Sequence, residues 1–182
     1  MKLLITLVSL FVLLLSGCIG VSEVVENPDN QHGMMMDGHM MMVASDAEFI
    51  ELMIPHHQEA VDTSELVLKT TKNPELKAFL EDVIETQSQE INQMQDWYMT
   101  WFGKEVPQSD YMAMMSGLEK FTGAELDKAY IEGMILHHEG AVDMARQALK
   151  FTERQEITEM AQAIIDVQTK EIETLKGWLN ES

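Results

Sequence analysis

The chain has 182 residues, and its 31 acidic and 12 basic side chains give a formal net charge of −19 at pH 7. This charge argues against nucleic acid and against an anionic membrane surface as electrostatic partners. Cys18 is the only cysteine, so the chain has no internal disulfide. The composition therefore excludes nucleic-acid binding and a disulfide scaffold as first explanations of the protein.

The first 17 residues have the pattern of a secretion signal. Lys2 precedes the apolar run 3–15, which is too short to span a membrane as a mature helix. Residues 15–18, Leu-Ser-Gly-Cys, resemble the lipobox of bacterial lipoprotein precursors, in which the cysteine is lipidated and becomes the first mature residue. We expect removal of residues 1–17, a lipid on Cys18, and export to the periplasmic or extracellular face of a membrane. The alternatives are an ordinary signal peptide with a chance cysteine, or an uncleaved anchor.

Residues 18–45 show no periodic apolar pattern, which predicts a flexible tether between the lipid and a folded domain. Within the tether, residues 31–42 read QHGMMMDGHMMM, so each of two histidines is followed closely by three methionines. Such a segment has no core for methionine to fill, and packing does not explain this composition. The tether therefore predicts a metal site made of His32, Met34, Met35, Met36, His39, Met40, Met41 and Met42.

The first two helices are predicted by their capping residues. Ser45, with a glutamate three positions later, forms a capping box for a helix over roughly 46–71. Asn73 is followed by a proline, an N-cap and first-turn pair that opens a second helix. This helix is expected to reach Phe102 and to end at Gly103.

The segment between the second and third predicted helices, residues 103–121, contains Pro107. It also contains a second methionine cluster, formed by Met112, Met114 and Met115.

The other two helices are predicted in the same way. Thr122 and Glu125 form a second capping box, which opens a helix that ends near Phe151. Thr152 can cap a fourth helix that ends near Leu179. The connection inside each pair of helices is short, so each pair is expected to form an antiparallel hairpin.

A motif occurs twice in these helices, 81 residues apart. Residues 49–62 read FIELMIPHHQEAVD, and residues 130–143 read YIEGMILHHEGAVD. The register continues without a gap, so the repeats cover about 46–102 and 122–181. Each half, at about 50 residues, would be marginal alone, and we expect the halves to share one core. Residues 46–182 are therefore predicted to form an all-α, antiparallel four-helix bundle made of two repeated hairpins.

The two copies of the motif are not identical. Pro55 in the first copy corresponds to Leu136 in the second. A proline inside a helix lacks an N–H and clashes with the carbonyl four residues earlier, which predicts a bend just before His56. The two copies are therefore expected to form related sites of different geometry or affinity.

Each copy places a methionine three residues before a His-His pair, and side chains three or four positions apart share a helix face. Adjacent histidines point about 100° apart, so one imidazole is expected to face the core and the other its edge. The candidate metal ligands in the helices are Met53, His56, His57, Met134, His137, His138 and Met144. Methionines at helical spacing are also ordinary core residues, and buried histidines are often structural, so both explanations stay open.

Copper, with Cu(I) favoured, fits these ligands best, because thioethers select soft ions and imidazole suits copper. Zinc would prefer cysteine, histidine and carboxylate, and would not use so many methionines. Iron in a helical bundle normally uses Glu-x-x-His pairs, which none of the six histidines has. Outside the cytoplasm thiols oxidise to disulfides, whereas thioethers form none, so methionine with histidine is a suitable set of soft-metal ligands there.

Polar side chains lie on or beside the apolar stripe of the second and fourth predicted helices, and a buried polar group must find a partner. They are Gln87, Glu90, Gln168 and Glu171. A histidine of the preceding helix, or Asp62 and Asp143, could be that partner. The set forms either a structural polar network or a group of hydrogen bonds that orients metal-bound imidazoles.

The pattern M-I-x-H-H-x-x-A-V-D, followed by Q-x-x-E-I-x-x-M-x-x-W, resembles the bacterial family numbered 305 among domains of unknown function, over about residues 46–180. The resemblance implies a ferritin-like four-helix bundle, usually exported, with some members associated with copper binding and copper resistance in the periplasm. The family pattern falls on Met53, His56, His57, Gln87, Glu90 and Met94, and on Met134, His137, His138, Asp143, Met144, Gln168 and Glu171. The copies depart from each other at Thr63, which corresponds to Met144, and at Leu175, which corresponds to Met94.

The sequence thus predicts an exported, lipid-anchored protein that binds Cu(I) through methionine and histidine, for sequestration or for transfer to a copper-handling partner protein. One alternative is a metal-free helical module for interactions in the envelope, with a buried His, Gln and Glu network. Another is a metal-dependent redox enzyme, although the sequence has no nucleophile pattern and no phosphate-binding loop.

Overall fold

The computed structural model describes residues 42–181. The predicted signal sequence, Cys18 and the tether ligands from His32 to Met41 lie outside these residues, so the predictions made for them stay predictions. Within the described part of the chain, no helix is both long and apolar enough to cross a membrane.

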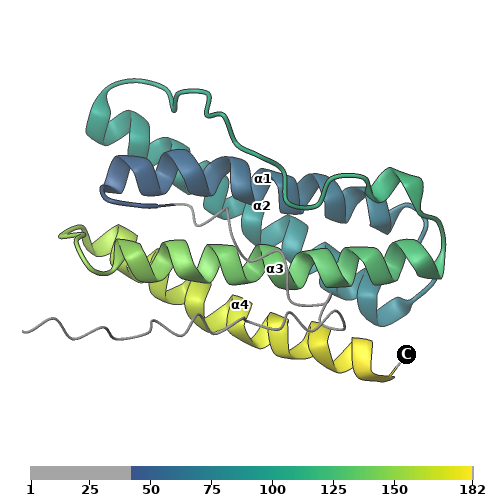
Figure 1. The fold of residues 1–182 in the computed structure, drawn as a ribbon. Helices are drawn as coiled ribbons and strands as arrows, with labels where there is room; N and C mark the ends of the chain where they lie inside the picture. Colours follow the sequence, from purple (N-terminus) through teal and green to yellow (C-terminus); the bar gives the residue numbers. More distant parts are fainter. Residues whose placement is uncertain (1–41, 182) are drawn as a thin grey trace, which may run out of the picture. The chain divides into compact units, whose positions relative to one another are not determined.

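Four long helices and one short 3-10 turn make up the folded part of the chain. They are α1 (Asp46–Leu68), α2 (Pro74–Phe102), η1 (Leu118–Lys120), α3 (Ala124–Ala148) and α4 (Gln155–Glu181). Helix α1 packs against α2, and α3 packs against α4, so each half of the repeat is a hairpin (Figure 1). Helix α1 also packs against α3, which joins the hairpins. Residues 42–181 contain no strand, and the prediction of an all-α bundle of two hairpins is confirmed.

Helices α1 and α3 run in opposite directions. Near the start of α1, the Val43 N–H donates to the side-chain oxygen of Gln147, close to the end of α3, at 2.9 Å. Beyond the end of α1, the Thr71 hydroxyl donates to Asp127, in the first turn of α3, at 3.0 Å. The middles of the two helices therefore lie side by side, and the middle is where both His-His pairs occur.

The predicted starts of the first two helices are correct. The Ser45 hydroxyl accepts from the Glu48 N–H, while the Glu48 carboxylate accepts from the N–H of Ala44. The Asn73 side chain accepts two backbone N–H bonds, and Gly103 ends α2 with a φ of 67°, a left-handed conformation that favours glycine. Helix α1 is continuous through Pro55, and a bend there stays a prediction.

The predicted starts of the last two helices need correction. The capping box at Thr122 is wrong, because α3 begins at Ala124 with Gly123 in the N-cap position and no side-chain cap. Gly123 has a φ of 58°, a conformation that threonine avoids, and this glycine sets the start of the helix. The Thr152 hydroxyl accepts from the Arg154 N–H, but α4 begins only at Gln155.

The interior consists of two apolar clusters with polar side chains between them. One cluster contains Phe49 of α1 and Ile157 of α4, and the other contains Val67 of α1 and Leu80 of α2. The residues between the clusters are here called the middle layer. This layer consists of His56, His57, Gln87, Glu90, His137, His138, Gln168 and Glu171.

The buried methionines of the helices belong to the apolar clusters. Met53, Met94 and Met144 are buried in the first cluster, and Met134 is buried in the second. Met42, at the start of the described residues, is 70% exposed. The predicted thioether ligands of the helices, Met53, Met134 and Met144, are therefore residues of the apolar core.

Candidate metal centre

All four histidines of the two motifs are completely buried, with exposed fractions of 0%. The prediction that only one imidazole of each pair faces the core is wrong, because α1 and α3 each pack against two other helices. The turn of about 100° between adjacent residues directs one ring toward one neighbour and the other ring toward the second. Thus His56 meets His137 of α3, whereas His57 meets Glu90 of α2.

The imidazoles of His56 and His137 stack across the α1–α3 contact, with ring centroids 3.7 Å apart and ring planes inclined by 34°. The His137 Nε2 lies 2.8 Å from the backbone carbonyl of His56 and can donate to it. Burial, together with the neighbouring imidazoles, lowers the pKa of both rings well below that of a free histidine. Both rings are therefore neutral at pH 7, which is the state in which imidazole binds metals.

His56 differs from the other three histidines. Neither of its ring nitrogens makes an aligned hydrogen bond or an ion pair within residues 42–181, although the ring interacts with the backbone of His137. A buried polar atom without a partner costs about 1–3 kcal/mol, and such atoms are rare in folded proteins. The His56 ring is thus a neutral, buried group with a nitrogen lone pair that no described protein group uses.

A buried glutamate attaches the segment between the hairpins to this place. Glu59 of α1 accepts a hydrogen bond from the Tyr111 hydroxyl, and its other oxygen accepts one from the Met115 N–H at 2.7 Å. Its Oε2 also lies 3.6 Å from the His137 Nε2. Burial and the adjacent carboxylate raise the pKa of Tyr111, so the hydroxyl stays protonated and can donate.

Glycine at position 140 leaves room beside the His56 ring. A Cβ added there would lie 3.2 Å from the His56 Nε2 and 3.8 Å from the Met114 sulfur. An imidazole nitrogen and a thioether sulfur therefore both lie within 4 Å of this one position, on the face of the α1–α3 contact where Tyr111 and Met115 bond to Glu59.

Sequence reasoning did not place Glu59, Tyr111 or Met114 in the candidate site. Two signals could have found them. Glu59 corresponds to Gly140 in the otherwise similar repeat, and Met114 belongs to the methionine cluster between the hairpins. Neither signal shows that the connecting segment crosses α1 beside His56.

The other two histidines face carboxylates. The His57 Nε2 lies 2.8 Å from Glu90, and the His138 Nε2 lies 2.8 Å from Glu171. A histidine of the preceding helix is thus the partner of each glutamate. This was one of the two partners expected from the sequence, the other being Asp62 or Asp143. In both pairs the carboxylate oxygen lies off the ring N–H direction, so neither contact is an aligned hydrogen bond.

The alternative partners, Asp62 and Asp143, lie on the surface. Asp62 accepts from Gln58 at 2.8 Å, and Asp143 pairs with Arg146 at 3.4 Å. Both aspartates therefore belong to exposed contacts along their own helices, away from the buried imidazoles.

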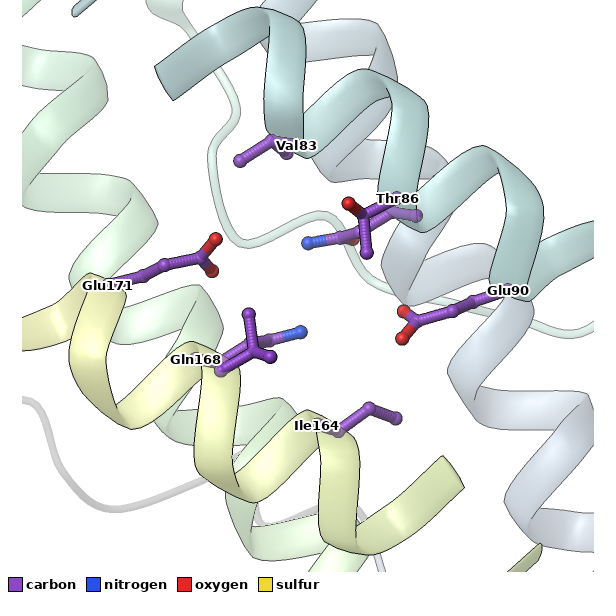
Figure 2. Close-up of a pocket in the computed structure, with 8 residues that line it drawn as sticks. Val83, Thr86, Glu90, Ile164, Gln168 and Glu171 are labelled. Atoms are coloured by element: carbon purple, nitrogen blue, oxygen red, sulfur yellow. The ribbon is translucent and has the colours of Figure 1, made fainter. Parts of the chain in front are cut away.

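The glutamines of the middle layer line a small pocket between α2 and α4. Gln87 and Gln168 are each 3% exposed, and the side-chain oxygen of each has no hydrogen-bond partner in the described residues. Figure 2 shows Gln168 in this pocket, with Glu90 and Glu171 on either side. The unpartnered groups of the middle layer thus lie on two sides of the bundle.

Among residues 42–181, no three His, Cys, Asp or Glu side chains converge on one ion-sized point. A metal bound in the middle layer would therefore need a further ligand type or a movement of side chains. Thioether sulfur is such a ligand on the His56 side, and glutamine oxygen is such a ligand in the α2–α4 pocket. The unpartnered nitrogen of His56 and the adjacent Met114 sulfur fit a soft metal ion.

The family model of DUF305, a domain of unknown function, matches residues 22–98 and residues 46–179. The chain belongs to the DUF305 family. Family membership, which the repeated motif led us to expect, is thereby confirmed, and the four-helix fold agrees with it. The match includes both His-His motifs and both Gln-x-x-Glu segments.

Solved structures with the same fold include CopM and proteins named as DUF305. CopM in its Cu(I)-bound form is 36% identical, with a TM-score of 0.71, and the match covers 76% of this chain and 98% of CopM. CopM has also been solved in Cu(II)-bound, silver-bound and apo forms. A DUF305 protein of Streptomyces coelicolor, named as a candidate secreted protein, is 26% identical, covering 75% of this chain and 93% of that protein, with a TM-score of 0.64.

A curated relative, protein L153 of Acanthamoeba polyphaga mimivirus, is 39% identical over 49 residues. The match covers 27% of this chain and only 32% of the viral protein. This DUF305 chain therefore spans about a third of that relative's length, and the similarity describes a shared segment only.

Proposed function

We propose that this DUF305 protein binds copper, with Cu(I) as the favoured ion. The observation that carries the proposal is the His56 ring, which is fully buried, neutral and without an aligned hydrogen bond or ion pair in the described residues, and whose Nε2 lies, like the Met114 sulfur, within 4 Å of the position of a Cβ at Gly140. A ligand on His56 would offset the cost of burying that ring. Imidazole and thioether together select a soft ion.

The relatives support this choice of metal. CopM binds Cu(I), Cu(II) and silver in its solved forms, and silver is a soft monovalent ion like Cu(I). The identity of 36% over nearly all of CopM makes related metal chemistry a reasonable inference for this chain.

We place the helical copper site at the α1–α3 contact. His56 and Met114 supply the first two ligands, and the stacked ring of His137 lies close enough to contribute after a rotation. Met53, Met134 and Met144 are buried in the apolar clusters, which favours a packing role for them. Glu59 and Tyr111 hold the connecting segment over the site.

The wider role follows from the sequence pattern. Cys18 would carry a lipid, the segment 31–42 with its histidines and methionines would capture the ion, and the bundle would hold it. This arrangement suits sequestration, or transfer to a partner protein that handles copper, outside the cytoplasm. Thioether and imidazole ligands, unlike thiols, do not form disulfides, so this ligand set is suited to an oxidising compartment.

The test is a competition for Cu(I) between the full-length protein and a chromophoric chelator. Met114→Leu removes the sulfur, and Met112→Leu is the matched control, because Met112 lies in the same segment and is 59% exposed. We expect Met114→Leu to weaken Cu(I) binding by the bundle by about tenfold or more, about 1.4 kcal/mol, and the control to leave it unchanged. A His56→Ala variant should lose at least as much.

The tether could hide a change in the bundle, so each variant is also made with residues 31–42 deleted. If the otherwise wild-type protein without residues 31–42 no longer competes with the chelator for Cu(I), the bundle has no copper site of its own. If His56→Ala lowers thermal stability but leaves Cu(I) affinity intact, the middle layer is a structural network, and the metal-free interaction module becomes the better account.

A further inference from the structure

A groove on the surface of the bundle lies between the C-terminal half of α2 and the N-terminal half of α4. It is here called the Trp97 groove, and its volume is about 360 Å³. Ligand pockets run from about 300 to 1,000 Å³, so the groove has room for one side chain or a small organic group. Its lining combines the indole of Trp97 with three carboxylates, those of Glu90, Glu156 and Glu159.

The ring of Trp97 lies at one end of the groove. It stacks on the ring of Trp101, one turn further along α2, with ring centroids 5.4 Å apart and planes inclined by 13°. The other α2 residues of the groove, Gln93 and Glu90, precede Trp97 by one and two turns. The groove therefore adjoins the side of the Trp97 ring opposite Trp101. The face of an indole carries partial negative charge and attracts a cation.

The carboxylates of the groove face no cationic side chain, because none of the residues that line it is a lysine or an arginine. Within the described part of the chain, Glu156 makes no hydrogen bond or ion pair, and Glu159 accepts from the neutral amide of Gln155 at 2.6 Å. Carboxylates gathered in one groove repel one another, and a cation between them removes that repulsion. The charge of the lining thus matches a cationic occupant.

The neighbouring indole already holds a cation from within the chain. The guanidinium of Arg154 lies over the Trp101 ring, 4.1 Å from its centroid, and pairs with the carboxylate of Asp46 at 3.2 Å. An indole and a carboxylate can hold a guanidinium together, because the planar group stacks on the ring while its N–H groups reach the oxygens. The Trp97 groove offers the same two surfaces to a cation from outside the chain.

The other end of the bundle shows that the fold does not require this groove. Trp178 corresponds to Trp97 in the second copy of the repeat, and its ring packs edge-on against Phe79, with centroids 5.7 Å apart. Next to Phe79, Ala78 stands at the position that Glu159 has in the groove. The second indole is thus covered by an aromatic ring of the same chain and has one carboxylate fewer beside it. The acidic groove is particular to the first copy.

We propose that the Trp97 groove receives the side chain of an arginine from a partner protein. The guanidinium stacks on Trp97, and Glu156 and Glu159 accept hydrogen bonds from its N–H groups. Arginine fits better than lysine, because its planar, forked group contacts the ring face and the carboxylates at the same time. The net charge of −19 steers a basic partner toward this surface.

The exposure of the groove favours a partner protein over a free cation. Gln93, Glu156, Glu159 and Ala163 line it and are all exposed. A small ligand in a well-formed pocket buries about 70–90% of its surface, whereas exposed walls leave one side of a bound molecule in water. A partner covers that side with its own surface, and arginine and tryptophan are enriched among the residues that dominate interfaces. No residue of the groove is a proposed copper ligand, so the inference does not rest on copper binding.

The test measures the binding of short peptides to the full-length protein by calorimetry. The probe is a blocked pentapeptide of glycine and serine with one central arginine, and its two controls carry lysine or citrulline, a neutral isostere of arginine, at the same place. The proteins are the wild type, the groove variant Glu156→Gln/Glu159→Gln, and the control variant Glu81→Gln/Glu173→Gln. The control variant changes exposed glutamates of α2 and α4 outside the groove and removes the same charge.

We expect the arginine peptide to bind the groove variant at least about fivefold more weakly than it binds the wild type and the control variant. The wild type should bind the lysine peptide more weakly than the arginine peptide, and the citrulline peptide more weakly still. Equal affinities of the wild type and the groove variant for the arginine peptide would refute the groove. Equal weakening in the groove and control variants would also refute it, because diffuse charge would then explain the binding.

A second variant, Trp97→Phe, tests the contact with the indole and keeps an aromatic ring in the groove. The arginine peptide should change the tryptophan fluorescence of the wild type, and most of this change should be lost in Trp97→Phe. A fluorescence change of the same size in both proteins would place the peptide elsewhere. Arginine amide, titrated in the same way, identifies the kind of occupant. If it binds the wild type as tightly as the peptide does, the occupant is a free cation and not a partner protein.

Discussion

The buried imidazoles make the stability of the metal-free protein depend on pH. Burial lowers the pKa values of His56 and His137 in the folded state, whereas in the unfolded chain each titrates near the ordinary value of about 6.5. As the pH falls below about 6.5, the unfolded state takes up protons that the folded state does not. The folded protein must therefore lose stability as the pH falls through this range and regain it as the pH rises.

The size of the effect follows from linkage. Between pH 7.5 and 5.5, each histidine that stays neutral in the folded state costs up to about 1.4 kcal/mol, so the pair costs up to about 2.7 kcal/mol. Carboxylates contribute little in this window, because their ordinary pKa values lie near about 4. For a bundle of this size, that loss lowers the melting temperature by roughly 6–10 °C.

The assay is urea unfolding of the metal-free protein at pH 7.5 and 5.5, followed by tryptophan fluorescence and by far-ultraviolet circular dichroism. The double variant His56→Gln/His137→Gln removes both titrating groups and keeps polar side chains of similar size. We expect its free energy of unfolding to change little over the same interval. An equal loss of stability in the wild type and the double variant would show that these imidazoles are not the cause.

Two further predictions concern single contacts. Gly140→Ala puts a methyl group 3.2 Å from the His56 Nε2 and should weaken Cu(I) competition by about tenfold, whereas Gly177→Ala, with nothing within 4 Å, should stabilise the protein by about 0.5–1 kcal/mol and leave Cu(I) binding unchanged. Equal Cu(I) affinities in the two variants would contradict the placement of the site. Ser64→Ala removes the partner of the buried Tyr130 hydroxyl, 2.7 Å away, and should cost about 1–3 kcal/mol in thermal unfolding, with no change in Cu(I) affinity. An unchanged melting temperature would mean that Tyr130 finds another partner.

The fold could be predicted from the sequence because its signals are local. The two backbone N–H bonds to Asn73 and the left-handed Gly103 depend on a few adjacent residues, and the repeat determines that the second hairpin resembles the first. The third helix was misplaced by one residue because Thr122 and Gly123 are both acceptable N-caps, and only the backbone conformation of Gly123 decides between them.

The candidate site could be predicted only in part. The pairing of Glu90 with His57 follows from helix periodicity and from the hairpin, so it was among the expectations. The contact of Glu59 with Tyr111 depends on the path of a segment that has no periodic pattern, and periodicity cannot place it. The burial of all four histidines depends on α1 having neighbours on two sides, which is a property of the assembled bundle.

The middle layer lowers the stability of the bundle, because it buries polar groups that lack hydrogen-bond partners in the described residues. The unpartnered nitrogens of His56 and the unpartnered oxygens of Gln87 and Gln168 each cost about 1–3 kcal/mol, against a typical total stability of 5–15 kcal/mol. Leucine at these positions would join the two apolar clusters into one core and remove that cost. Because the polar groups occur at equivalent positions in both repeats, a common requirement must hold them there. The proposed binding of copper beside His56 would supply such a requirement on that side of the layer, since a ligand would offset the burial of the ring.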